Sequence, residues 1–184
     1  MTLQERFFTA EQFDAFTERP ENADKLFEFI GGEIVEVPSN PYSSKIAARF
    51  TRYLGEHADD NDLGHVTGEQ GGYQVSGERY APDTAYISFE RQEALVKSGY
   101  NPNAPDIAVE VVSSDSTAEN DMLTIKLGNY LTAGTVVWIV RPEKKRVEVH
   151  VPGQPVKVLN ETDTLTGGDV LPKLKIDLRK IFKA

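Results

Sequence analysis

The sequence contains no cysteine, which excludes disulfide bonds and thiolate metal sites. It has no run near the roughly 18 apolar residues that a membrane span needs. The N-terminal stretch MTLQERFFTAEQF has no apolar core of signal-peptide length. The three histidines, at positions 57, 65 and 150, are scattered without metal-binding spacing. We therefore expect a cytoplasmic protein without membrane association, and any metal site in it must rely on oxygen ligands.

Several catalytic signatures are missing as well. There is no glycine-rich phosphate loop of the Walker or dinucleotide type, and no G-x-S-x-G motif of a serine hydrolase. No low-complexity segment or Pro-, Gly- or Ser-rich linker interrupts the chain. A chain of 184 residues with 39% hydrophobic content is long enough for one core, so we predict a single domain over residues 1–184.

Basic residues are in the minority, with 20 against 29 acidic residues and a formal net charge of -9. This balance opposes nucleic-acid binding, because DNA affinity comes largely from neutralising phosphates. The segment SSKIAARFTRYLGEH (43–57) nevertheless reads as a helix with Lys45, Arg49 and Arg52 along one face. A solvated helix face is the simpler interpretation of these three residues, and contact with nucleic acid is the alternative.

The order of predicted elements favours a mixed sheet with helices on both faces. The elements are a capped helix at 9–18, a β-hairpin at 26–37, the helix at 43–57, strands at 65–75 and 83–89, a short helix from about Arg91, a strand at 106–112, a helix at 113–134 and a hairpin of 135–140 with 146–151.

Three local signals support this assignment. Thr9 with Gln12 forms a capping-box pattern, and Gly31-Gly32 suits a tight hairpin turn. Ser116 is a suitable N-cap for the later helix, with Glu119 at the third helical position and Gly134 just past its end. Three leucines of this helix are predicted to form its core stripe, at positions 123, 127 and 131.

The least expected feature is the presence of carboxylates within or at the start of predicted apolar strands. NAPDIAVEVVSS (103–114) places Glu110 within an otherwise apolar strand, and YAPDTAYISF (80–89) repeats Ala-Pro-Asp at Asp83. Asp106 and Glu110 are about 13 Å apart along one strand, too far to share a metal ion. If the two strands are neighbours, about 4.8 Å apart, Asp83 and Glu110 can converge on one cation.

Lys126 supplies a third group from the following helix. Met122 and Tyr130, four residues to either side, place its stem in a partly apolar stripe. Taken singly, Asp83 could be a turn or cap residue, Glu110 a satisfied buried acid and Lys126 a surface residue. Taken together, the set has the composition of a site for metal-assisted phosphodiester hydrolysis, in which carboxylates hold Mg²⁺ and a lysine steadies or deprotonates the attacking water.

The same residues carry a resemblance that covers nearly the whole chain. The pattern consists of Pro82-Asp83, PDIAVEVVSSDS (105–116), Lys126 with Tyr130, VVWIVRPEKKRVEVH (136–150) and LTGGDVLPKLKIDLRKIF (165–182). It resembles the Uma-two family, bacterial proteins described as restriction endonuclease-like within the PD-(D/E)XK nuclease superfamily.

The resemblance implies a three-layer α/β/α mixed sheet with a restriction endonuclease-like core, carrying an N-terminal and a C-terminal β-hairpin. It further implies Asp83 and Glu110 as ligands of magnesium or manganese and Lys126 as the catalytic lysine. The superfamily lysine normally lies two residues after the acid, where this chain has Val112. In the resembling family that lysine is understood to have moved to the helix.

Other positions have lesser roles under this hypothesis. Glu69 is an auxiliary metal-ligand candidate, although a loop acid beside glycines explains it equally well. Asp106 and Asp115 are interpreted as structural, at a strand start and in a helix cap region. Ser43 or Ser44 occupies the place where the family often has a histidine.

Two functions remain open on the sequence alone. One is a magnesium-dependent endonuclease acting on nucleic acid, with DNA as the expected substrate. The other is a catalytically silent nuclease-fold module that binds nucleic acid or a protein partner. A homodimer is expected only by analogy with nucleases that cut two strands.

Overall fold

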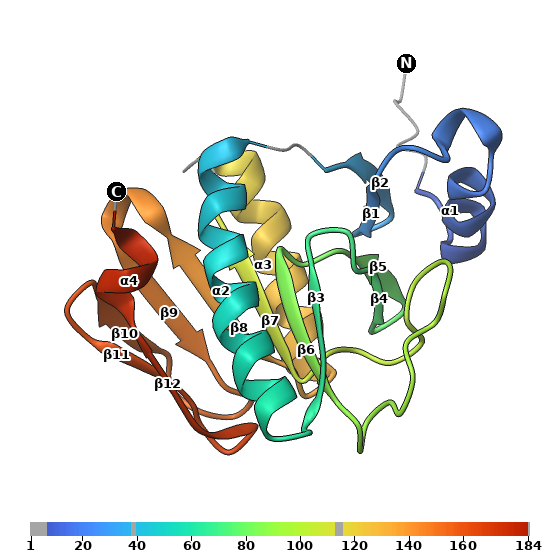
Figure 1. Ribbon diagram of the computed structural model, residues 1–184. Helices are drawn as coiled ribbons and strands as arrows, with labels where there is room; N and C mark the ends of the chain where they lie inside the picture. Colours follow the sequence, from blue (N-terminus) through green and yellow to red (C-terminus); the bar gives the residue numbers. More distant parts are fainter. Residues whose placement is uncertain (1–6, 38–39, 113–115, 184) are drawn as a thin grey trace.

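A six-stranded mixed sheet forms the centre of the molecule (Figure 1). The computed structural model describes residues 7–37, 40–112 and 116–183. The strand order is β10-β9-β8-β7-β6-β3; β7 and β8 are parallel, and the other neighbours are antiparallel. The strands are β3 (Gly64–Gly68), β6 (Thr84–Ser88), β7 (Ile107–Val111), β8 (Val136–Arg141), β9 (Arg146–His150) and β10 (Lys157–Asn160).

One long helix covers each face of this sheet, α2 (Pro41–Asp60) on one side and α3 (Thr117–Thr132) on the other. The alternation of side chains along β7 separates the two faces. Val109 packs in the cluster that contains Phe50 of α2, whereas Ala108 packs in the cluster that contains Tyr130 of α3. The three-layer α/β/α arrangement predicted above is therefore confirmed.

A smaller antiparallel sheet, in the order β2-β1-β5-β4, lies beside α3. It contains β1 (Phe27–Ile30), β2 (Glu33–Glu36), β4 (Tyr73–Val75) and β5 (Glu78–Tyr80), with α1 (Ala10–Thr17) packed against β1. Gly31 and Gly32 make the β1–β2 turn with φ of 59° and 86°, a region that favours glycine. The predicted hairpin and the capping box of α1 are both confirmed.

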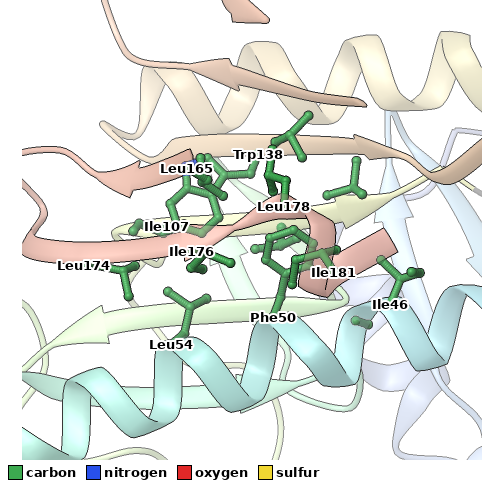
Figure 2. Close-up of a cluster of buried hydrophobic side chains, with 14 of the residues drawn as sticks. Ile46, Phe50, Leu54, Ile107, Trp138, Leu165, Leu174, Ile176, Leu178 and Ile181 are labelled. Atoms are coloured by element: carbon green, nitrogen blue, oxygen red, sulfur yellow. The ribbon is translucent and has the colours of Figure 1, made fainter. Parts of the chain in front are cut away.

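The C-terminal segment closes the core on the α2 side. It forms the two-stranded ribbon of β11 (Thr164–Gly167) and β12 (Leu171–Asp177), followed by α4 (Leu178–Phe182). Figure 2 shows side chains of this segment, such as Ile176 and Ile181, directed toward Phe50 on α2. Two short 3₁₀ turns, η1 (Pro20–Asn22) and η2 (Pro142–Lys144), complete the described elements. No helix in these described ranges is long and apolar enough to cross a membrane.

Two predicted elements are wrong. The strand expected over 65–75 is divided into β3 and β4, which belong to different sheets. A turn separates them, in which the Gly71 amide donates to the Gly68 carbonyl at 2.9 Å. Glycine is required here, because a Cβ on Gly71 or Gly72 would lie 2.4 Å from Thr67 or Tyr100. The helix expected from Arg91 is a series of turns, in which the Arg91 side chain bonds the carbonyls of Ala104 and Pro105.

The core stripe of α3 also differs from the prediction. The buried residues of this helix are Lys126 and Tyr130, while the leucines at 123, 127 and 131 are only partly buried. The cap at Ser116 is confirmed, with its hydroxyl accepting from the Glu119 amide at 3.2 Å. The helix thus buries a polar pair at the sheet, while Leu123 and Leu127 pack against the same core cluster and are only partly buried.

Candidate active site

Asp83 and Glu110 meet where β6 begins and β7 ends. Thr84 pairs with Val109, so the residue before Thr84 and the residue after Val109 lie at the same level of the sheet. The Val111 amide donates to Asp83 Oδ2 at 2.6 Å. Both carboxylates line the same pocket, as the convergence of neighbouring strands predicted.

Lys126 reaches this pair from α3. Its Nζ donates to Glu110 Oε2 at 2.8 Å and to Glu28 Oε1 at 2.8 Å. The side chain is buried, and its ammonium also lies 5.5 Å from the centre of the Tyr80 ring. The structure therefore brings the three predicted residues together at one pocket.

Glu28 is the member of the site that sequence reasoning missed. It lies on β1, where all four residues are buried, and its Oε1 also accepts from the Ala81 amide at 2.7 Å. The signal was present in the sequence, because Glu28 interrupts the apolar run of FEFI as Glu110 interrupts its own strand.

Tyr130 completes the support of Glu110. Its hydroxyl donates to Glu110 Oε1 at 3.0 Å, so both oxygens of that carboxylate have a donor. The ring packs edge-to-face on Tyr80 with centroids 5.2 Å apart, and the Tyr80 hydroxyl donates to Glu78. Glu78 in turn accepts from the Gly31 amide at 2.7 Å. This network connects the site to the β1–β2 turn.

Burial dominates the electrostatics of the carboxylates. It raises the pKa of Asp83 to about 6, against the lowering effects of the Val111 amide and Lys126. It raises the pKa of Glu110 to about 7, where Lys126 opposes the shift and Glu28 adds to it. Burial alone would lower the pKa of Lys126, but Glu110 and Glu28 outweigh that effect and the pKa is raised. The lysine is therefore a permanent cation at neutral pH.

The site opens into two adjoining pockets. The smaller, about 340 Å³, is lined by Glu28, Asp83, Glu110 and Lys126, together with residues of the start of α3 and of the β1–β2 hairpin that include Glu119 and Glu36. The larger, about 600 Å³, contains Glu69. Asp83, Asn40 and Ser43 line both pockets, so the N-terminus of α2 stands at their junction. These hollows could admit a phosphate group and its neighbours to the carboxylates.

Glu69 lies on the same level of the sheet as Asp83. Gly68 pairs with Thr84, so Glu69 follows the last paired residue of β3 as Asp83 precedes the first of β6. Its side chain is exposed. Within the described ranges, however, no group of three His, Cys, Asp or Glu side chains is arranged to hold a metal ion.

The remaining predicted residues have other contacts. Arg49 donates to the carbonyls of Ile181 and Lys183 at 2.7 Å and 2.6 Å, so its guanidinium joins α2 to the C-terminal segment. Lys45 and Arg52 are exposed on α2. Asp106 has structural contacts, accepting from the Ser88 amide at 2.7 Å and pairing with Arg91 at 3.0 Å. Asp115 lies outside the described residues.

Comparisons with known proteins identify the family and the fold of this chain. The family model of Uma2, described as "Putative restriction endonuclease", matches residues 10–179, and the chain belongs to this family. A crystal structure described as a putative nuclease belonging to DUF820 from Anabaena variabilis ATCC 29413 superposes with a TM-score of 0.79 at 19% identity. The match covers 95% of this chain and 97% of that chain, and it shows a common fold. A search of curated proteins found no match. Family membership supports a nuclease function.

Proposed function

We propose that this protein is a metal-dependent endonuclease that hydrolyses phosphodiester bonds of DNA. Asp83 and Glu110 would hold a magnesium or manganese ion, Glu69 would assist from the neighbouring strand, and Lys126 would be the catalytic lysine. One observation carries the proposal: a buried lysine bound to two carboxylates lies beside a third carboxylate in an open pocket. The family supplies the reaction class.

The charges of the site fit a divalent cation. The residues that line the smaller pocket include five acids, Glu28, Glu36, Asp83, Glu110 and Glu119, and one base, Lys126. Burial disfavours the charged form of a carboxylate, and it raises the pKa values of Asp83 and Glu110 although the positive charge of Lys126 lowers them. Hard carboxylate oxygens are the ligands that magnesium and manganese prefer. When bound, such an ion would polarise the phosphate and acidify a water molecule.

Lys126 is better suited to hold charge than to remove a proton. Its raised pKa keeps it protonated, so it can donate hydrogen bonds to a phosphate oxygen or to the attacking water but cannot act as a base. Glu28 and Glu110 fix the position of its ammonium. Of the two roles considered for this lysine, the arrangement supports steadying the water.

A catalytically silent module is the second candidate. In its favour, the Lys126 ammonium already donates to Glu28 and Glu110, and both oxygens of Glu110 have donors. Such a site could serve only to hold the hairpin, the sheet and α3 together. A module of this kind would bind nucleic acid or a protein without cleaving anything.

Calorimetry with magnesium and manganese separates the two candidates without knowledge of the preferred DNA sequence. The native protein should bind the ion, and Glu110→Gln and Asp83→Asn should each abolish binding while keeping the fold by circular dichroism. Cleavage of supercoiled plasmid should fail in the same variants. Glu148→Gln is the matched control, because this acid of β9 is paired with Arg141 and Arg146 away from the pocket.

Three outcomes would be decisive. Binding and cleavage lost together in the site variants, but kept in Glu148→Gln, would support the nuclease. Metal binding without cleavage of any DNA or RNA tested would contradict it and leave the binding module. A folded native protein that binds neither ion, alone or with a short DNA duplex present, would remove the metal site itself.

A further inference from the structure

Charge is distributed unevenly along this acidic chain. Residues 171–183, LPKLKIDLRKIFK, carry five basic residues and one acid, a formal charge of +4. Since the whole chain carries -9, the remainder carries -13. A basic end on an acidic protein is a pattern associated with polyanion binding.

The fold places this segment along α2. The first contact joins His57 near the end of α2 to the Pro172 carbonyl at 3.0 Å. The second joins Arg49, about two turns earlier in the helix, to the carbonyls of Ile181 and Lys183 at the end of the chain. β12 and α4 therefore run antiparallel to α2, and Figure 2 shows Ile181 packed beside Ile46 and Phe50.

The basic side chains of the two elements are exposed on the outer side of the molecule. Leu174 and Ile176 of β12 are buried in the core, so Lys175 between them points the opposite way. On α4, Ile181 is buried while Lys180 is exposed. We call five of the exposed basic residues the basic ridge: Lys45 and Arg52 from α2, and Lys175, Lys180 and Lys183 from the C-terminal segment. Arg179 is exposed as well but pairs with Asp177 at 2.9 Å, and the exposed Lys173 lies near the start of β12.

The ridge has the length of a short stretch of nucleic acid and ends near the site. From Lys45 to Arg52, α2 extends about 10 Å at 1.5 Å per residue. That length spans about three phosphates of one DNA strand at 3.4 Å each. At the other end, Lys45 is less than one helical turn from Ser43, which lines both pockets.

We propose that the basic ridge binds the phosphate backbone of the DNA substrate and guides it to the pocket. Arg49 has a different role, since its guanidinium holds the C-terminal segment against α2. The carboxylate-lined pocket repels phosphates, so affinity must come from another surface, and the ridge supplies positive charge beside it. The inference rests on the proposed function for the identity of the ligand.

The test uses the salt dependence of binding to a short fluorescent DNA duplex of mixed sequence, with EDTA present so that nothing is cut. Each phosphate contact contributes about 0.9 to the slope of log affinity against log salt concentration. Lys180→Gln/Lys183→Gln should therefore lower the slope by about 1.8 relative to the native chain. The control, Lys97→Gln/Lys157→Gln, removes two exposed lysines from elsewhere and should leave the slope unchanged.

Failure of this inference differs from failure of the proposed function. The proposed DNA contact of the ridge would be contradicted by any of three results: equal slopes in the native chain and the ridge variant, an equal loss of slope in the control, or no DNA binding by the native chain. None of these results would affect the metal-binding test at Glu110. Conversely, if the ridge binds DNA but the protein binds no metal ion, the proposed nuclease function is refuted and the DNA-binding role of the ridge stands. If the ridge variant alters self-association in sedimentation and not DNA binding, the ridge instead meets the acidic surface of a second copy.

Discussion

Lys126 and Glu28 form an ion pair at 2.8 Å although 98 residues separate them in the chain. One belongs to α3 over the central sheet and the other to β1 of the smaller sheet. Glu28 also accepts from the Ala81 amide, two residues before Asp83. A single carboxylate thus connects the hairpin, the helix and the segment that carries a proposed metal ligand.

Replacing this lysine tests the pair. In Lys126→Met the stem is kept but the ammonium is lost, which leaves Glu28 and Glu110 buried without the positive charge that both contact. Breaking a buried pair from one side costs about 3–5 kcal/mol, and nuclease activity should disappear. Chemical denaturation of the folded variant gives the stability, and plasmid cleavage gives the activity.

Lys145→Met is the matched control for that variant. Lys145 pairs with Glu161 at 3.0 Å, and the two side chains are 52% and 37% exposed, away from both pockets. Exposed pairs contribute about 0–1 kcal/mol, so little stability and no activity should be lost. If Lys126→Met were as stable as Lys145→Met, the buried network would not be holding the hairpin to α3.

Most features that depend on short-range spacing, such as strand alternation, helix caps and turns, could be predicted from the sequence. Alternation along 106–112 placed Glu110 on the face opposite Val109, and strand adjacency placed it near Asp83. The caps of α1 and α3 and the glycine turn of the first hairpin were also correct. These features depend on spacing within a segment or between two neighbouring strands, and a sequence displays such spacing directly.

What the sequence did not disclose depends on contacts between distant segments. Glu28 joins the site because β1 pairs with β5 and contacts α3, a tertiary arrangement that no local pattern specifies. Three leucines of α3 are predicted as its core stripe; Leu123 and Leu127 do pack against the core, but the polar network buries Lys126 and Tyr130 more deeply. The break between β3 and β4 falls at a turn in which the Gly71 amide donates to the Gly68 carbonyl, and its glycines allow the close approach of Thr67 and Tyr100.

Tyr130→Phe tests the role of the tyrosine as a positioning residue. The ring is kept, and the hydrogen bond to Glu110 is lost, at a cost in unfolding free energy of about 0.5–1.5 kcal/mol. Glu110 then loses a donor to its charged form, so its pKa should rise and the pH profile of cleavage should move to higher pH. Tyr73→Phe removes an equally buried hydroxyl, bonded to Thr67 at 2.9 Å, and should lose similar stability with no shift of the profile.

The turn that supports Glu28 can be tested with a pair of glycines. Gly31→Ala forces a side chain into a left-handed conformation with φ of 59° and brings its Cβ 3.2 Å from Ile125. We expect a loss of about 1–2 kcal/mol in unfolding free energy. Gly128→Ala, in α3 with nothing within 4 Å of the added Cβ, should instead gain about 0.4–1 kcal/mol. Denaturant unfolding should give changes in unfolding free energy of opposite sign for the two variants. A loss of stability in both would contradict the open space at Gly128.

Stability of the metal-free protein should fall as pH rises through the pKa values of the site carboxylates. The pKa values of Asp83 and Glu110 are raised by burial to about 6 and about 7, from ordinary values of 3.8 and 4.5. The folded state therefore holds protons that the unfolded chain has already released. This contribution to the unfolding free energy is complete below the ordinary values and is lost as pH rises through 6 and 7.

Magnesium should reverse that dependence, because it binds the deprotonated carboxylates. Its affinity should increase over the same interval, with protons released on binding, and the bound ion should restore stability at the higher pH. Unfolding by denaturant between about pH 5 and pH 8, with EDTA and with magnesium, measures both effects. The difference between the two curves should widen with pH in the native protein and vanish in Glu110→Gln. A magnesium effect that is constant with pH would mean that the ion binds elsewhere, because only groups that titrate in this interval can couple its affinity to the proton concentration.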